Sequence, residues 1–146
     1  MRACIQRVIC ANCVVDQKIV SETNKGYMIL VGFTHTDTLE NVKKMAKKIA
    51  NLRVFSDAEG KMNLSIKDIQ GEILCISQFT MYADASAGNR PSFVNSMEPA
   101  KANELYQQLV NLLNEEYEIK TLPGVFGAHM ELHPICDGPV TINLEN

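Results

Sequence analysis

Three polar side chains stand at the end of an otherwise apolar stretch: Ser77, Gln78 and Thr80. Hydroxyl and amide groups at a strand end often line binding sites, because side chains there emerge at the edge of the sheet. Thr80 is the candidate nucleophile of this group, but a threonine hydroxyl is weak without a neighbouring base. No histidine accompanies it in the nearby sequence. The alternative is a strand that simply ends at the protein surface, where polar residues are common.

Gly138 and Pro139 form a second unusual feature, because they interrupt a stretch whose composition is typical of strands. Proline lacks the N–H that a central strand donates, so it is expected at a turn or an edge. Glycine has no side chain and lets a ligand approach the main chain. The simpler interpretation is an ordinary β-turn. Only about 5–6% of X-Pro bonds in folded proteins are cis, so the dipeptide alone predicts a trans bond.

Four residues imitate the ligand set of a zinc site: Cys10, Cys13, His133 and Cys136. A Cys-x-x-Cys pair and a His-x-x-Cys pair could together supply three thiolates and one imidazole. On strands, however, such spacing is often incidental, and neither half lies in a glycine-rich turn. A redox role for the Cys-x-x-Cys pair is not favoured either, because no strand–CxxC–helix order surrounds it. We therefore expect no metal and no cofactor.

Six stretches have the composition and periodicity of strands, and they are residues 2–8, 13–20, 27–33, 72–79, 129–135 and 140–144. The first two interleave apolar and polar residues and are expected to be joined by a short connection. The next two are continuously apolar, as expected of strands covered on both faces. The last two are expected to form a closing pair around a turn at 136–139.

Two amphipathic helices are predicted between these strands. The first begins at Asp37, whose carboxylate can cap it while Glu40 reaches back in a capping box, and it ends near Arg53. Its apolar face consists of residues at helical spacing: Leu39, Val42, Met45, Ala46, Ile49 and Ala50. The second helix has Pro99 in its first turn. Its buried stripe consists of Ala102, Leu105, Tyr106, Leu109, Leu112 and Leu113.

These elements predict one mixed α/β domain over residues 1–146, with mainly antiparallel strands in layered sheets and both helices packed on one face. A chain of 146 residues can bury roughly 70% of its unfolded surface. Hydrophobic residues make up 46% of the sequence, which is enough for a core. The alternating strands leave another sheet face that needs cover, from a second sheet layer or from a dimer partner.

The net charge of −3 argues against a protein that coats nucleic-acid backbones, because such affinity comes from lysine and arginine. It leaves open a protein that grips one end of an RNA in a pocket. Residues 1–7 lack the apolar core of a signal peptide, and the longest apolar run, 27–33, is far shorter than the roughly 20 residues of a membrane span. Together with five cysteines, this favours reduced thiols in the cytoplasm.

Several segments resemble the D-aminoacyl-tRNA deacylase family, also known as the D-tyrosyl-tRNA deacylase family. Residues 77–83 (SQFTMYA) resemble its SQFTLYA motif, and residues 137–141 (DGPVT) resemble the end of its NDGPVT motif. Further similar segments occur in the same order over nearly the whole chain, at 5–8, 55–64, 88–93 and 124–130. The sequence departs from the family pattern at Cys136, where asparagine is usual, and at Pro123, where a polar residue is commoner.

The resemblance implies hydrolysis of the ester of D-aminoacyl-tRNA and rejection of the L form. It implies a homodimer in which a cis Gly138–Pro139 bond of each chain enters the pocket of the other, so that main-chain carbonyls exclude L side chains. Arg7 matches the arginine that holds this loop by bonding its carbonyl. Glycyl-tRNA is then expected to be tolerated, because glycine has no side chain to exclude.

The same resemblance places Phe126 and Met130 against the terminal adenosine of the tRNA, where an aromatic face can stack on the base. Taken alone, both residues would be interpreted as core residues. For the chemistry, it implies assistance by the ribose 2′-OH, with Ser77 to Thr80 orienting the ester. Gln78 and the main-chain N–H groups of Phe79 and Thr80 could then stabilise the developing oxyanion.

Two other functions stay open at this point. The chain could bind an RNA end without catalysis, using the lysines of the first helix: Lys43, Lys44, Lys47 and Lys48. Such a charged strip is more often a solvated helix face. A sister type of deacylase, with the Gly-Pro bond in trans, removes certain mischarged L-amino acids; the intact segments 77–80 and 140–141 favour the D-specific type.

Overall fold

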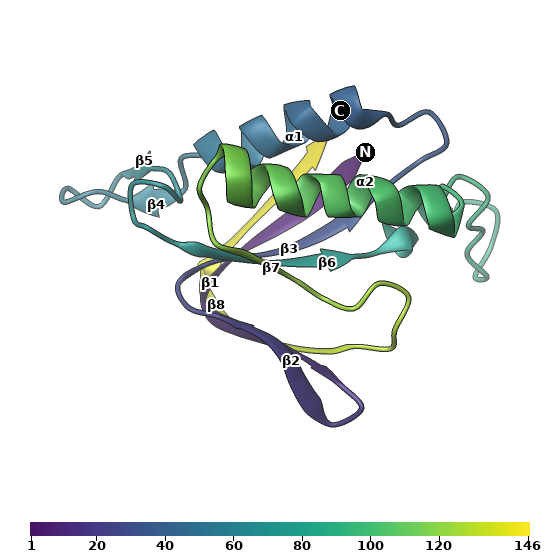
Figure 1. Cartoon of the computed structure of the whole chain (residues 1–146), viewed down its shortest axis with the longest axis horizontal. Helices are drawn as coiled ribbons and strands as arrows, with labels where there is room; N and C mark the ends of the chain where they lie inside the picture. Colours follow the sequence, from purple (N-terminus) through teal and green to yellow (C-terminus); the bar gives the residue numbers. More distant parts are fainter.

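The computed structural model describes residues 1–146 and has a mixed α/β architecture (Figure 1). Its strands are β1 (Arg2–Val15), β2 (Lys18–Thr23), β3 (Gly26–Gly32), β4 (Phe55–Ser56), β5 (Met62–Leu64), β6 (Glu72–Ser77), β7 (Thr121–Pro123) and β8 (Glu131–Glu145). Its helices are α1 (Leu39–Asn51), the 3₁₀ helix η1 (Phe79–Tyr82), α2 (Pro99–Asn111) and the π-helical turn η2 (Leu112–Glu116). Neither α1 nor α2 is long and apolar enough to cross a membrane.

β1 organises a six-stranded sheet, because it is long enough to pair along both of its edges. β3 pairs with residues 2–8 of β1 and β2 pairs with residues 11–15. β8 pairs with β1 as well, and all three strands are antiparallel to it. Beyond β3, the strands β6 and β7 continue the sheet in parallel, whereas β4 and β5 form a separate hairpin. The prediction of a mixed sheet with mainly antiparallel strands is therefore confirmed.

Two strands joined by a short connection are present, but the break predicted between residues 8 and 13 is wrong, because β1 runs unbroken to Val15 and β2 begins at Lys18. The reversal comes at Asp16 and Gln17, whose φ angles of 49° and 62° suit a two-residue hairpin turn. The sequence alternation is broken earlier, where the register shifts between Val8 and Cys10. Such a bulge changes which residues face the core without ending the strand.

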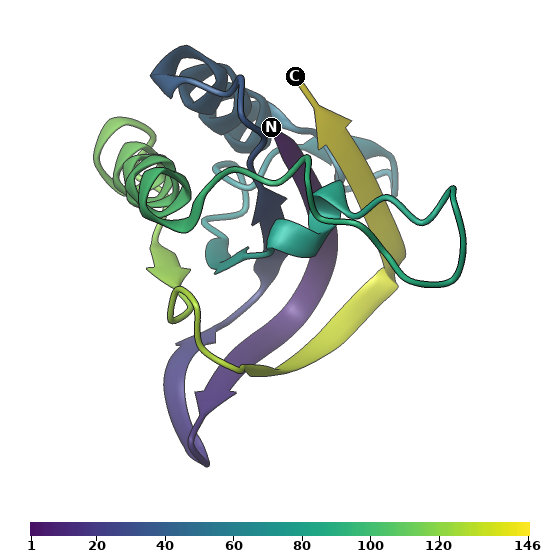
Figure 2. The same cartoon turned by 90° about the vertical axis from the view of Figure 1, so that its right-hand side faces the viewer.

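The predicted closing pair of strands is also one continuous element, β8, which is antiparallel to β1 throughout (Figure 2). Gln6 pairs with Thr141 and Val8 pairs with Cys136, so the four residues 137–140 lie opposite one residue of β1. Residues 137–140 are thus a bulge in a long strand, and the turn predicted at 136–139 is absent. Proline has no N–H to donate to a neighbouring strand, and a bulge accommodates it as a turn would, because the bulged residues need no strand partner.

The two helices lie side by side over one face of the sheet, as predicted (Figure 1). α1 buries Val42, Met45, Ala46, Ile49 and Ala50, whereas Leu39 is 41% exposed. α2 starts with Pro99, and the carboxylate of Glu98 caps it by accepting from the N–H of Lys101 at 2.8 Å. The large core lies between these helices and the inner face of β1, β3 and β6.

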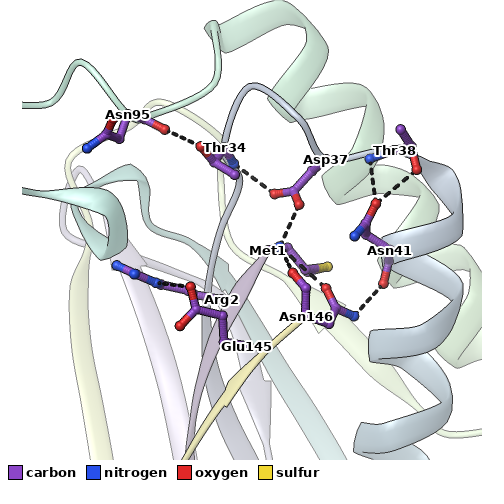
Figure 3. Close-up of polar contacts among 9 residues, drawn as sticks. All are labelled: Met1, Arg2, Thr34, Asp37, Thr38, Asn41, Asn95, Glu145 and Asn146. Atoms are coloured by element: carbon purple, nitrogen blue, oxygen red, sulfur yellow. Dashed lines mark hydrogen bonds and ion pairs between the residues drawn. The ribbon is translucent and has the colours of Figure 1, made fainter.

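Asp37 does not cap α1, and this prediction is wrong. The N-cap is Thr38, whose N–H donates to Oδ1 of Asn41 at 3.0 Å, so that Asn41 takes the place expected for Glu40. Asp37 is instead 2% exposed and accepts from the amino group of Met1 at 2.5 Å and from the N–H of Thr34 at 2.8 Å. Figure 3 shows this cluster, in which both ends of the chain meet the start of α1.

The opposite face of the sheet carries a smaller buried cluster, formed by Val8, Ala11, Cys13, Leu74 and Ile76. No helix of the chain covers it (Figure 1). Two side-chain atoms of β1 are buried without a hydrogen-bond partner, Nε2 of Gln6 and Oδ1 of Asn12. The predicted need for cover on this face is therefore not met by a second sheet layer within one chain.

Candidate active site

The turn after β6 arranges the residues 77–80. Gln78 continues the extended chain, with its N–H donating to the carbonyl of Val31 at 2.7 Å, and η1 begins at the next residue. Phe79 and Thr80 are therefore the first two residues of a helix, and no carbonyl of that helix can accept from their N–H groups. Neither has a partner among the main-chain hydrogen bonds. Two adjacent free donors at a helix start suit an anion or a developing oxyanion.

The Thr80 hydroxyl is bonded to an amide and not to a base. The side-chain Nε2 of Gln78 donates to Oγ1 of Thr80. His129 is the histidine that lines the adjacent pocket, and no hydrogen bond joins it to Ser77 or Thr80. Without a base the hydroxyl stays a weak nucleophile, so this arrangement favours orientation of a substrate over attack by Thr80.

A cavity of about 660 Å³ opens beside this turn. Ser77, Gln78 and Phe79 line one part of it, and Phe126 and Met130 line another part. These five residues come from segments almost fifty positions apart in the sequence, and the fold brings them together. Thr80 lies on the same turn but does not line the cavity. The size is within the range of sites for one small-molecule-sized ligand.

Phe126 and Met130 are held by the residues behind them and are only partly buried. The ring of Phe126 packs on Tyr106, with the ring centroids 6.0 Å apart. Burial raises the pKa of Tyr106, so its hydroxyl remains a proton donor, and it bonds the carbonyl of Cys75 at 2.7 Å. Met130 lies against Gly124, where an added Cβ would be 2.8 Å from the sulfur. This backing fixes the orientation of both side chains toward the cavity.

Gly138 and Pro139 lie outside this cavity, on the exposed bulge of β8. The peptide bond between them is cis, and Gly138 has φ of 125°. A Cβ at this position would lie 3.0 Å from the N–H nitrogen of Val140, so the backbone requires glycine on both counts. The bulge is therefore exposed and does not line the cavity of its own chain.

Arg7 fixes this bulge from the opposite strand. Its side chain is 11% exposed, and Nε lies 3.2 Å from both the carbonyl oxygen and Oδ2 of Asp137. Its Nη1 donates to the carbonyl of Val54 at 2.6 Å. The acceptor on the bulge is thus Asp137, the residue before Gly138. A planar guanidinium with several fixed donors is suited to hold two segments at once.

The zinc interpretation has no support in the geometry. No group of three or more His, Cys, Asp or Glu side chains is arranged to hold a metal ion. Cys13 is buried in the smaller apolar cluster, and burial raises the pKa of its thiol. Cys136 is exposed directly before the bulge. A buried thiol with a raised pKa is a poor ligand and a poor nucleophile.

Among the cavity residues that were not singled out for function from the sequence are Phe93, Glu98 and His129. Phe93 ends one of the segments that resemble the deacylase family, which was the available signal. Glu98 is already engaged as the cap of α2. His129 belongs to the same loop as Phe126 and Met130, but its type alone gave no reason to choose it over the other histidines.

A family model described as D-Tyr-tRNA(Tyr) deacylase matches residues 4–145. The chain belongs to this family. A D-aminoacyl-tRNA deacylase of Thermosipho melanesiensis is 46% identical to it over 146 residues, which covers 100% of this chain and 97% of the relative. A D-aminoacyl-tRNA deacylase of Clostridium perfringens is 48% identical with the same coverage.

Two solved structures are similar to this member of the deacylase family. One, described as c-Myc DNA Unwinding Element Binding Protein, is 40% identical, with a TM-score of 0.94 over 100% of this chain and 99% of that chain. The other, described as a probable eukaryotic D-amino acid tRNA deacylase, has a TM-score of 0.83 over 98% of both chains. At 14% identity, the second likeness concerns the fold alone.

Proposed function

We propose that residues 1–146 form one deacylase domain that hydrolyses the ester between a D-amino acid and the terminal ribose of tRNA, in the cytoplasm and without a metal or cofactor. Membership of the family supports the reaction class. The observation that carries the site is that residues 77–79 of the turn line one cavity with Phe126 and Met130. The turn offers donors for an ester, and the two side chains offer an apolar surface for a base.

In the proposed reaction, water adds to the ester carbonyl and the bond to the ribose oxygen breaks. Of the two protons of the water, one reaches the ribose oxygen and the other is released to solvent, so the amino acid leaves as the carboxylate. The free N–H groups of Phe79 and Thr80, with the amide of Gln78, stabilise the oxyanion that forms on the carbonyl. The adjacent ribose 2′-OH assists in place of a protein base. Ser77 and Thr80 orient the ester, which agrees with the bond between Thr80 and Gln78.

Chiral selection is proposed to come from a second copy of the chain. Gly138 and Pro139 are exposed and lie outside their own cavity, so they are available to another subunit. Their carbonyls would face the α-carbon of the substrate in the partner's cavity. An L side chain would then meet main-chain oxygen and be excluded, whereas a D side chain would point away and be accepted without any contact to it. Glycyl-tRNA would be accepted.

A homodimer would also cover the sheet face that the helices leave open. That face carries the smaller apolar cluster around Val8 and Leu74, and Gln6 has a buried donor without a partner. Burial of apolar area and pairing of such a donor both favour association. Arg7 would keep the bulge in the shape that enters the other subunit, through its bonds to Asp137.

A non-catalytic RNA-end binder is the second candidate. The exposed lysines of α1 favour it only weakly, because Lys44 is paired with Glu40 and the net charge is −3. Incubation of D-tyrosyl-tRNA with purified protein separates the two functions. We expect release of free D-tyrosine with turnover. Stable D-tyrosyl-tRNA in the presence of saturating protein would favour the binder.

A further inference from the structure

Two exposed aromatic rings, Phe79 and Phe93, form a ledge at the edge of the cavity. Their ring centroids are 5.0 Å apart and the rings are tilted by 65°, an edge-to-face arrangement. Both line the cavity, yet Phe79 is 58% exposed and Phe93 is 41% exposed. Single exposed apolar residues are common, but a pair of aromatic rings in contact beside a cavity is typical of a binding surface.

The ledge is held in place by hydrogen bonds of the main chain around it. Oγ of Ser96 donates to the carbonyl of Phe79 at 3.0 Å, which ties the segment after Phe93 to η1. The N–H of Ser96 donates to the carbonyl of Phe93, also at 3.0 Å. On the other side, Oγ1 of Thr34 donates to the carbonyl of Asn95 at 2.6 Å. The exposed rings are therefore preorganised, so little conformational entropy is lost when a ligand packs on them.

We propose that this ledge stacks the base of the nucleotide that precedes the terminal adenosine of the substrate. The inference rests on the proposed function, in which the terminal nucleoside and the aminoacyl group occupy the cavity. A volume of about 660 Å³ holds a ligand of that size, so the preceding nucleotide must lie outside. The ledge is continuous with the cavity and offers the aromatic face on which single-stranded bases stack regardless of sequence.

Three substrates of increasing length test the ledge. The first is D-tyrosyl-adenosine, and the second carries in addition a phosphate and an abasic ribose before the adenosine. The third is the D-tyrosyl dinucleotide, in which that ribose bears cytosine. In the wild type we expect addition of cytosine to raise kcat/KM by roughly 5- to 100-fold over the abasic compound, as for one stacked base. Phe93→Leu keeps an apolar side chain but removes the ring, and should reduce that gain to within about twofold. An unchanged gain in Phe93→Leu would overturn the proposal.

Val94→Ala is the matched control, because Val94 is 73% exposed, adjacent in sequence and outside the cavity lining. It should leave the cytosine gain as in the wild type. Sedimentation of both variants tests the competing occupant: a loss of dimer in Phe93→Leu alone would mean that a second copy covers the ledge.

Binding of the non-acylated dinucleotide, with and without cytosine, is measured alongside. A cytosine preference that Phe93→Leu removes would support the ledge even if the wild type hydrolysed no substrate, an outcome that would contradict the proposed function. Equal binding of the compounds with and without cytosine to the wild type would overturn the proposed role of the ledge.

Discussion

Nε of Arg7 lies 3.2 Å from both the carbonyl oxygen and Oδ2 of Asp137, the residue directly before Gly138. One side chain of β1 thus fixes the main chain of β8 at the point where the two strands lose their register. The same guanidinium bonds Val54, which precedes β4. The shape of the exposed bulge therefore depends on a residue that does not itself touch the cavity.

Arg7→Lys should loosen the bulge without removing the positive charge. A lysine ammonium is a single point donor and cannot bond Asp137 and Val54 together in the same planar geometry. We expect the ratio of D- to L-tyrosyl-tRNA hydrolysis to fall by about tenfold, which corresponds to about 1.4 kcal/mol of discrimination. Arg53→Lys is the control, since Arg53 is exposed and its guanidinium bonds Asn63 in β5. A ratio unchanged in Arg7→Lys would contradict the positioning role.

The free N–H of Phe79 can be removed with little change of the backbone. Phe79 is the first residue of η1, where proline is tolerated, and Gln78 before it has φ of −144° and ψ of 93°, outside the α region that a following proline disfavours. Phe79→Pro should lower kcat by roughly 100- to 1,000-fold relative to Phe79→Leu, as for the loss of one oxyanion donor. The pair of variants separates the N–H from the ring, and equal rates in both would exclude the N–H from catalysis.

Thr80→Ala is the companion to that test, and it should stay within about tenfold of the wild-type rate, because the main-chain donors remain. If turnover is abolished while tRNA still binds, the hydroxyl is essential and the orienting role assigned to it is wrong. Binding is followed separately with non-acylated tRNA.

Asp37→Asn should destabilise the fold strongly. It leaves the amino group of Met1, which is 0% exposed, without a charged partner. Breaking a buried ion pair costs about 3–5 kcal/mol, and urea unfolding measures the loss. Glu40→Gln is the matched control, because Glu40 and Lys44 are 3.9 Å apart and each 66% exposed. It should change the free energy of unfolding by less than about 0.5 kcal/mol. Equal effects of both substitutions would contradict the role given to Asp37.

Cys75 predicts a loss of stability at alkaline pH. Burial raises the pKa of its thiol from 9.0 to about 12. Between these values the unfolded chain loses the proton while the folded chain keeps it, so the free energy of unfolding falls as pH rises above 9 and the contribution is gone above 12. Unfolding in urea from pH 8 to 11 should follow this slope, and Cys75→Ala should make it shallower. An identical slope in the variant would assign the effect to other groups.

The positions of both helices and of the two apolar strands could be predicted from the sequence, because burial imposes a period that the residues display. The boundaries that failed have a common cause. β1 and β8 are bent by bulges, where the register shifts at Val8 and around Gly138. A bulge interrupts the apolar alternation as a turn does, so the sequence pattern alone does not separate the two.

The role of Asp37 failed for a different reason. Local spacing favours it as a helix cap. Its carboxylate instead forms an ion pair with a group distant in sequence, the amino group of Met1 (Figure 3). Likewise, residues 77–79 share a cavity with Phe126 and Met130 only because of tertiary packing, including that of Phe126 on Tyr106. The family resemblance named these residues, whereas composition and periodicity did not bring them together.

Comparison of D- and L-tyrosyl-tRNA hydrolysis by the purified protein tests the central claim most directly. The proposed exclusion of L side chains by the carbonyls of Gly138 and Pro139 predicts rapid release of D-tyrosine. It also predicts that L-tyrosyl-tRNA decays at its rate without enzyme. Equal hydrolysis of both forms, or preference for the L form, would contradict the proposed chiral selection.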